Sequence, residues 1–167
     1  MKTIIVTGTP GTGKTTLAKK LSEIMKFAYI DANKVIAKYN LSEGYDYKRK
    51  SKIIDTKKLN SKILEIIKEI EKSKKYGVAI IDTHLSHYIP KNKADICIVT
   101  KCGLKTLARR LKKRSYSKEK IRENMDAEIF DVCLNEAKEA GHKISVIETT
   151  GRLNFNQIAK KILREIK

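Results

Sequence analysis

The chain has 167 residues, which is enough for one domain with a sizeable hydrophobic core. Its 37 lysines and arginines outnumber 19 aspartates and glutamates, giving a formal net charge of +18 and a field that attracts polyanions. No apolar run approaches the roughly 18 residues of a membrane span, and the first strand starts too early for a signal peptide, so we expect a cytoplasmic protein with no membrane partner.

A strand predicted over residues 3–6 leads into the most informative motif of the chain. Residues 8–15 read Gly-Thr-Pro-Gly-Thr-Gly-Lys-Thr, the G-x-x-x-x-G-K-[ST] pattern of a phosphate-binding loop, or P-loop. A helix is expected next, because apolar residues recur at helical spacing: Leu17, Leu21, Ile24 and Met25. Strand, glycine loop and helix together predict a site for a nucleoside triphosphate.

Two residues of the motif have distinct expected roles. Lys14 should reach the β- and γ-phosphates of ATP, and the Thr15 hydroxyl should be a ligand of Mg²⁺. The sequence therefore predicts ATP and Mg²⁺ as the cofactors of the site.

The next predicted strand covers residues 27–30 and ends at Asp31, which borders the same cleft. Asp31 could contact the acceptor of a transferred group, or it could cap the helix that follows. Residues 32–55 are polar and mixed, so we expect short helices and loops there. A clear helical stripe then runs from Leu59 to Ile70.

The second half repeats the alternation of strand and helix. The expected elements are strands at 77–82 and 95–100, a basic helical stretch, a turn at 115–117, one long helix over 118–140, a strand at 143–149 and a helix at 155–166. In the long helix Ile121, Met125, Ile129, Val132 and Cys133 should point inward. The pattern predicts an α/β fold, a parallel sheet flanked by helices on both faces, with the nucleotide at the carboxyl ends of the strands.

Asp82 and His84 leave the same predicted strand end. Asp82 follows four apolar residues, the arrangement of a Walker B acid that positions Mg²⁺ beside a P-loop; the alternative is an acid that caps a turn. His84 should face the cleft, where it could orient a water or a substrate oxygen or relay a proton.

The stretch 101–120 holds nine lysines or arginines and one glutamate. On a helix Arg110 and Arg114 share one face, so both could close over phosphates as clamps, whereas Arg109 is a weaker candidate. A solvated basic face is the alternative. The three cysteines form no C-x-x-C pair, and we expect small buried residues rather than a metal or redox site.

With these motifs in place, the chain resembles a known family. The P-loop, Asp82-Thr83-His84, the run from Arg110 to Tyr116 and the run from Glu123 to Phe130 are similar to those of the ribosome-associated adenylate kinases, the isoenzyme 6 or CINAP type. The resemblance spans the whole chain. This sequence differs from many members at Thr83, at Leu85 and at Ser115, where an aromatic residue, glycine and glycine respectively are common.

The resemblance implies an adenylate kinase-like fold of one P-loop kinase domain over residues 1–167, with a short nucleoside-monophosphate-binding (NMP) segment at about 30–53 and a short lid at about 108–118. It implies that ATP is held by Gly11, Thr12, Gly13, Lys14, Thr15, Thr16 and Arg110, and that catalysis depends on Lys14, Asp82, His84 and Arg114. AMP would be the acceptor, with Thr15 and Asp82 at the metal.

The family also implies a role in small-subunit rRNA maturation, with a small-subunit ribosomal protein and rRNA as partners. Two functions are therefore open at this point. One is an adenylate kinase, ATP plus AMP giving two ADP; the other is mainly an ATPase switch that remodels a ribosomal protein–RNA complex. A non-catalytic RNA-binding module is disfavoured by the intact set of Lys14, Thr15 and Asp82.

Overall fold

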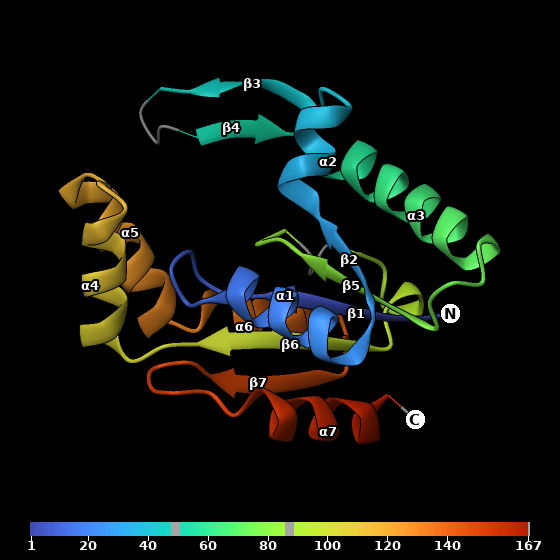
Figure 1. Ribbon diagram of the computed structural model, residues 1–167. Helices are drawn as coiled ribbons and strands as arrows, with labels where there is room; N and C mark the ends of the chain where they lie inside the picture. Colours follow the sequence, from blue (N-terminus) through green and yellow to red (C-terminus); the bar gives the residue numbers. More distant parts are fainter. Residues whose placement is uncertain (48–50, 86–88, 167) are drawn as a thin grey trace.

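Five apolar segments form one central sheet. In the computed structural model, which describes residues 1–47, 51–85 and 89–166, the strands are β1 (Lys2–Thr7), β2 (Ala28–Asp31), β5 (Val78–Asp82), β6 (Ile96–Lys101) and β7 (Ile144–Glu148). Their order is β2-β5-β1-β6-β7, and each neighbouring pair is parallel (Figure 1). The predicted α/β architecture is confirmed.

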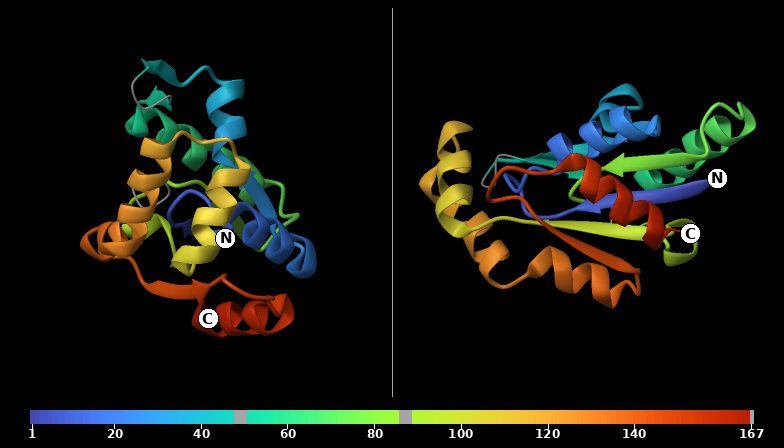
Figure 2. Two further views of the ribbon diagram at one scale, coloured as in Figure 1. Left: turned by 90° about the vertical axis from the view of Figure 1, so that its left-hand side faces the viewer. Right: turned by 60° about the horizontal axis from the view of Figure 1, so that its bottom comes forward.

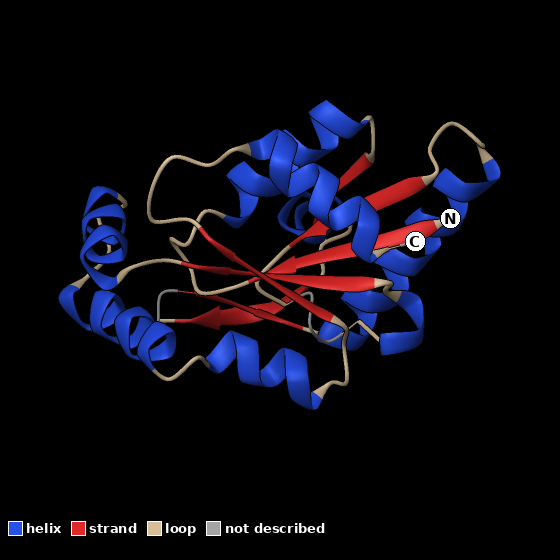
Figure 3. Ribbon diagram, turned by 90° about the horizontal axis from the view of Figure 1, so that it is seen from below, coloured by secondary structure: helices blue, strands red, loops and turns tan. Residues whose placement is uncertain are grey.

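Alternation along β1 shows how the sheet is covered on both sides. Ile4 and Val6 pack against α1 (Lys14–Met25) and α7 (Phe155–Glu165), whereas Ile5 faces the other way. That second face is covered by α3 (Thr56–Lys72) and α6 (Val132–Glu139). Figure 3 shows helices on both faces of the sheet. Strands buried on both faces explain the nearly continuous apolar runs in the sequence.

Two further structures stand at the carboxyl ends of the strands. Helix α2 (Ala32–Lys38) leads into a separate antiparallel hairpin of β3 (Ser42–Asp46) and β4 (Ser51–Ile54), and α4 (Leu104–Lys113) is followed by α5 (Lys118–Ile129). The hairpin and the α4–α5 pair lie on different sides of this end of the molecule (Figure 2). The short 3₁₀ helix η2 (Lys91–Lys93) precedes β6.

The expectation of short helices and loops over residues 32–55 was wrong in its second half. This region contains α2 and then the hairpin, whose residues Ser42 to Tyr45 are exposed. A hairpin that pairs only with itself needs no buried face, so it leaves no apolar alternation in the sequence. Residues 48–50 lie outside the described part of the chain.

The expectation of one long helix over residues 118–140 was also wrong. The helix ends at Ile129, Asp131 adopts a left-handed φ of 54°, and α6 starts at Val132. The Lys101 ammonium donates to the Glu128 carbonyl oxygen at 2.9 Å and also bonds the Asp131 carboxylate, which fixes the break. As a result Ile129 and Val132, expected inside, are 53% and 38% exposed.

Three smaller expectations have a structural outcome. Asp31 caps α2, because its Oδ1 accepts from the N–H groups of Asn33 and Lys34 at 3.0 and 3.3 Å. Cys97 and Cys102 are buried as expected, whereas Cys133 is half-buried. No helix in the described ranges combines the length and the apolar character that crossing a membrane requires.

Candidate active site

The P-loop between β1 and α1 depends on glycines that tolerate unusual backbone angles and close neighbours. Gly8 and Gly11 have φ angles of +141° and +96°. A Cβ atom on Gly8 would lie 2.4 Å from Thr100 Oγ1, and one on Gly11 would lie 2.9 Å from side-chain carbons of Leu107 and Leu111. The loop can therefore pack directly against β6 and α4 only because both positions are glycine.

Buried threonines hold the loop from inside. The Thr12 hydroxyl donates to the Thr9 carbonyl oxygen at 2.8 Å and lies 2.6 Å from the Thr100 hydroxyl, which also lies 3.2 Å from the Thr7 carbonyl oxygen. The Thr12 N–H is bonded to the same Thr9 oxygen. Thr12 was predicted to hold ATP. In the structure its hydroxyl and its N–H both bond to the protein itself, so these groups stabilise the conformation of the P-loop.

Lys14 begins α1 and lies across the loop. Its Nζ donates to the carbonyl oxygens of Gly8 and Thr9 at 2.7 and 3.1 Å. An ammonium has three N–H groups, so it can donate one more bond, to a phosphate. Removal from water lowers the pKa of Lys14 to about 8. The negative charge of Asp82 opposes this shift, whereas the positive charge of Arg114 adds to it.

Asp82 ends β5 beside the P-loop strand. It is 3% exposed and pairs in register with Val6 of β1 and Asp31 of β2. The Tyr29 hydroxyl donates a hydrogen bond to its Oδ2 at 2.9 Å. Burial, reinforced by this carboxylate, raises the pKa of Tyr29, so the phenol remains a hydrogen-bond donor.

The donor set fits Mg²⁺. Thr15 and Thr16 are exposed residues in the first turn of α1, and Asp82 stands at the neighbouring strand end. A hydroxyl and a carboxylate are hard oxygen ligands, and Mg²⁺ commonly takes few protein ligands while keeping several waters. Thr15 and Asp82 are therefore suitable residues to hold this ion.

A buried carboxylate connects the P-loop to α5. Glu128 is 4% exposed, and its Oε2 accepts from the Thr9 hydroxyl at 2.6 Å while its Oε1 accepts from the Cys102 N–H at 2.8 Å. The Lys101 ammonium lies 3.4 Å from the same Oε1. One side chain of α5 thus fixes the P-loop and the end of β6 relative to each other.

Arg110 lies between the P-loop and the end of β7. Its Nη2 donates to the Thr149 carbonyl oxygen at 2.7 Å, and its Nη1 donates to Thr149 Oγ1 at 3.2 Å and to the Gly11 carbonyl oxygen at 3.4 Å. These bonds hold the guanidinium against the loop, on the wall of a cavity of about 450 Å³. The cavity is lined by Gly11, Gly13, Thr16, Arg110, Lys113, Arg114, Thr149, Gly151, Leu153 and Phe155.

Arg114 reaches the same cavity from the C-terminal end of α4, one helical turn beyond Arg110. It is exposed, whereas the Arg110 guanidinium is held by hydrogen bonds to Thr149 and Gly11. The turn that follows contains Ser115 with a left-handed φ of 54°, a conformation that suits the glycine common at this position in the resembling family.

His84 faces a second cavity, of about 460 Å³, on the side of α2 and the hairpin. The lining residues are Asn33, Ile36, Lys52, Ile54, Thr56, His84 and Leu85. His84 is exposed, and its carbonyl oxygen lies 3.5 Å from the Thr7 hydroxyl at the end of β1. The structure thus places Asp82 and His84 at one strand end, with the histidine turned towards α2 and β4.

Sequence reasoning missed Tyr29, Glu128 and Thr149. Their contacts join them to residues at least 26 positions away in the chain, so no local motif marks them. A signal existed only for Glu128, which lies in the run from Glu123 to Phe130 that carries the family resemblance, but no role could be read from it.

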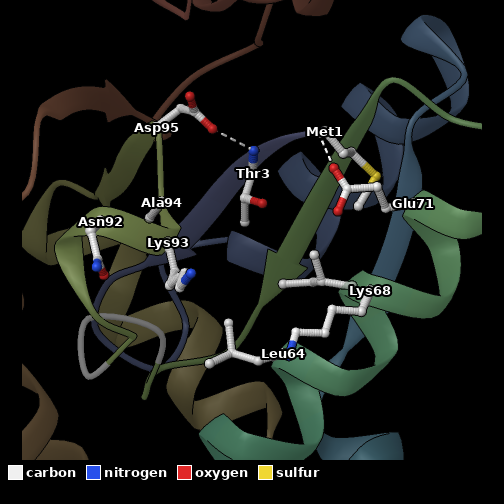
Figure 4. Close-up of a pocket in the computed structure, with 10 residues that line it drawn as sticks. Met1, Thr3, Leu64, Lys68, Glu71, Asn92, Lys93, Ala94 and Asp95 are labelled. Atoms are coloured by element: carbon white, nitrogen blue, oxygen red, sulfur yellow. Dashed lines mark hydrogen bonds and ion pairs between the residues drawn. The ribbon is translucent and has the colours of Figure 1, made fainter.

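A further cavity of about 420 Å³ lies at the opposite, amino ends of the strands (Figure 4). Its two carboxylates are engaged: Asp95 Oδ2 accepts from the Thr3 N–H at 2.7 Å, and Glu71 pairs with the amino group of Met1. This cavity contains no residue of the P-loop, and we do not include it in the active site.

Comparison with known proteins shows the family to which the chain belongs. A model of the AAA domain family matches residues 4–131. A protein of Methanosarcina acetivorans named "Putative adenylate kinase" is 42% identical over 147 residues, 88% of this chain and 77% of that protein. The "Adenylate kinase isoenzyme 6 homolog" of Caenorhabditis elegans is 34% identical over 137 residues, 82% and 72% of the two chains.

Among solved structures, shikimate kinase from Acinetobacter baumannii in complex with shikimate has a TM-score of 0.60 at 15% identity, covering 99% of this chain and 93% of that one. At this identity the likeness shows the fold, which is that of a P-loop kinase.

The Glu128 contacts predict a large loss of stability on truncation. Glu128→Ala removes the acceptors of the Thr9 hydroxyl and the Cys102 N–H and leaves Lys101 partly unpaired, so the free energy of unfolding should fall by roughly 3 kcal/mol. Denaturant unfolding measures this value. Glu123→Ala, on the exposed side of the same helix, should change it by no more than about 0.5 kcal/mol. A similar small change in both variants would contradict the account.

The lowered pKa of Lys14 predicts that ATP binding depends on pH. The ammonium carries its charge below about pH 8 and loses it above, so ATP affinity should fall as pH rises through 8, by up to about tenfold per pH unit. Titration with a fluorescent ATP analogue between pH 6.5 and 9.5 measures the effect. Lys14→Ala should bind weakly with a flat profile, and Lys20→Ala, an exposed residue of the same helix, should keep the wild-type profile. An ATP affinity of the wild-type protein that does not change with pH would contradict this prediction.

Proposed function

Because the chain belongs to the family that includes these adenylate kinase-like proteins, we propose that it is a nucleoside monophosphate kinase that transfers a phosphoryl group from ATP to AMP and gives two ADP. The observation that carries the proposal is the pair of cavities at one end of the sheet. One adjoins the P-loop and its arginines, and the other adjoins His84, two residues beyond Asp82. A donor and an acceptor nucleotide each need such a place.

The donor, ATP, is assigned to the cavity beside the P-loop. Glycine backbone N–H groups and the amino end of α1 favour phosphates there. Arg110 is held against the loop by Thr149 and Gly11, so its guanidinium is pre-positioned for ATP. Leu153 and Phe155 supply an apolar wall that suits a base.

The acceptor, AMP, is assigned to the cavity of about 460 Å³ under the hairpin. Lys52 of β4 offers a positive charge to its phosphate, and Ile36 and Ile54 offer apolar contacts to its base. The NMP segment proposed at about 30–53 provides three of the seven lining residues, Asn33, Ile36 and Lys52.

Charge stabilisation is the main requirement of phosphoryl transfer. Lys14 would neutralise the β- and γ-phosphates, and the exposed Arg114 would close over the transferred group as part of a lid at about 108–118. Mg²⁺, held through Thr15 and Asp82, supplies further neutralisation of the phosphate charge when bound. His84 would orient the acceptor oxygen or exchange a proton with it.

Turnover with separate measurement of ADP and inorganic phosphate tests the proposal. The purified protein with Mg-ATP should form ADP without matching phosphate when AMP is added, and CMP, UMP and GMP serve as parallel acceptors. Lys14→Ala should lower the rate of AMP-dependent ADP formation at least about 100-fold, because a charge that neutralises the phosphates is removed. Lys20→Ala should retain it. Phosphate release that ignores every monophosphate would refute the kinase.

A second function, an ATPase switch in small-subunit rRNA maturation, is favoured by two observations. The formal net charge of +18 exceeds what a nucleotide site needs and suits an RNA or ribonucleoprotein surface. His84 is exposed in the cavity on the acceptor side, where it could orient a water in place of AMP. A small-subunit ribosomal protein and rRNA would be the partners.

The variant His84→Ala tests the histidine role. It should lower phosphate release or phosphoryl transfer by about 10²–10³-fold and leave ATP affinity within about twofold, because the imidazole lies outside the ATP cavity. Asn33→Ala is the matched control, because it alters the lining of the same cavity but removes no titratable group. Equal losses of ATP affinity and turnover would assign His84 to ATP binding instead.

A further inference from the structure

Tyr29 has a polar contact that the mechanism above does not use. Its hydroxyl donates to Asp82 Oδ2 at 2.9 Å, and Asp82 is buried, with 3% of its surface exposed. A buried carboxylate needs hydrogen-bond donors, and each donor also restricts how the carboxylate can rotate. The question is whether this contact only satisfies Asp82 or also orients it.

The register of β2 and β5 places the Tyr29 side chain close to Asp82. Tyr29 pairs with Ile80, and Asp82 follows two residues later on β5. Side chains two residues apart on a strand point to the same face, so Tyr29 and Asp82 share the face that α1 covers. The ring packs with the core of this face, which holds the hydroxyl at the strand end.

Helix α1 shows which side of the P-loop Tyr29 approaches. The Lys19 ammonium lies 5.9 Å from the centroid of the Tyr29 ring. Residues four apart lie on one side of a helix, so Thr15 is on the same side of α1 as Lys19. The Tyr29 ring therefore lies along the side of α1 that carries the Thr15 hydroxyl, next to Asp82.

We propose that Tyr29 is a positioning residue of the metal-binding end of the site: its hydroxyl engages one oxygen of Asp82 and so orients the other oxygen towards the cation and the waters around it. The inference rests on the proposed function, since it assumes that Thr15 and Asp82 hold Mg²⁺ with a nucleotide. Partners of this kind typically change metal affinity by 10–100-fold when they are removed.

Tyr29→Phe is the appropriate variant, because it deletes the hydroxyl and keeps the ring that packs beneath α1. The probe is Mn²⁺, whose free concentration is read by electron paramagnetic resonance in the presence of a non-hydrolysable ATP analogue. The variant should bind Mn²⁺ about tenfold more weakly, while its affinity for the analogue in EDTA stays within twofold of wild type. Tyr76→Phe, a hydroxyl deletion beyond the site, should match wild type in both measurements.

A purely structural role of the hydroxyl gives different results. Unchanged Mn²⁺ affinity, or equal weakening of analogue binding with and without metal, would overturn the inference. A double-mutant cycle guards against general destabilisation: adding Tyr29→Phe to Asp82→Asn should not weaken Mn²⁺ binding further, and an additive loss would overturn the inference. If wild type bound Mn²⁺ no better with the analogue than without it, the proposed function would fall as well.

Discussion

The parallel register of β2, β5 and β1 is the constraint on which the site depends. It aligns Asp31, Asp82 and Val6 at one end of the sheet, directly before the P-loop. Parallel strands all run in one direction and are joined by crossovers, so every strand of the sheet ends at the same edge. The P-loop, Asp82 and the two cavities of about 450 and 460 Å³ therefore lie together at the carboxyl ends of the strands.

Glu128 connects this frame to the α4–α5 pair, which contains the proposed lid. Through the Thr9 hydroxyl and the Cys102 N–H, it ties the start of the P-loop to the base of the α4–α5 pair. The exposed Arg114 lies at the far end of α4, beyond this anchor. If this segment closes as proposed, the anchor at its base would let Arg114 approach the phosphates without displacing the P-loop.

Local patterns predicted the five strands of the central sheet, the P-loop and the place of Asp82 at a strand end, because each rests on short apolar runs or on glycines at fixed spacing. Contacts between distant segments were not predictable in the same way. Tyr29 meets Asp82 only through strand pairing, and the break at Asp131 depends on Lys101 from β6. Strand β3 is mostly exposed, so it leaves no apolar alternation in the sequence. The sequence thus predicted where the P-loop and Asp82 lie, whereas the contacts that support them required the fold.

The most direct test of the central claim is a map of where a nucleotide binds. At 19.0 kDa the chain suits amide NMR, with a non-hydrolysable ATP analogue and Mg²⁺ titrated into ¹⁵N-labelled protein. We predict the largest shift changes at residues 8–16, at Thr83 and at Gly151, all at the carboxyl ends of the strands. Changes concentrated at Thr3 and Asn92, around the cavity at the opposite end, would contradict the account.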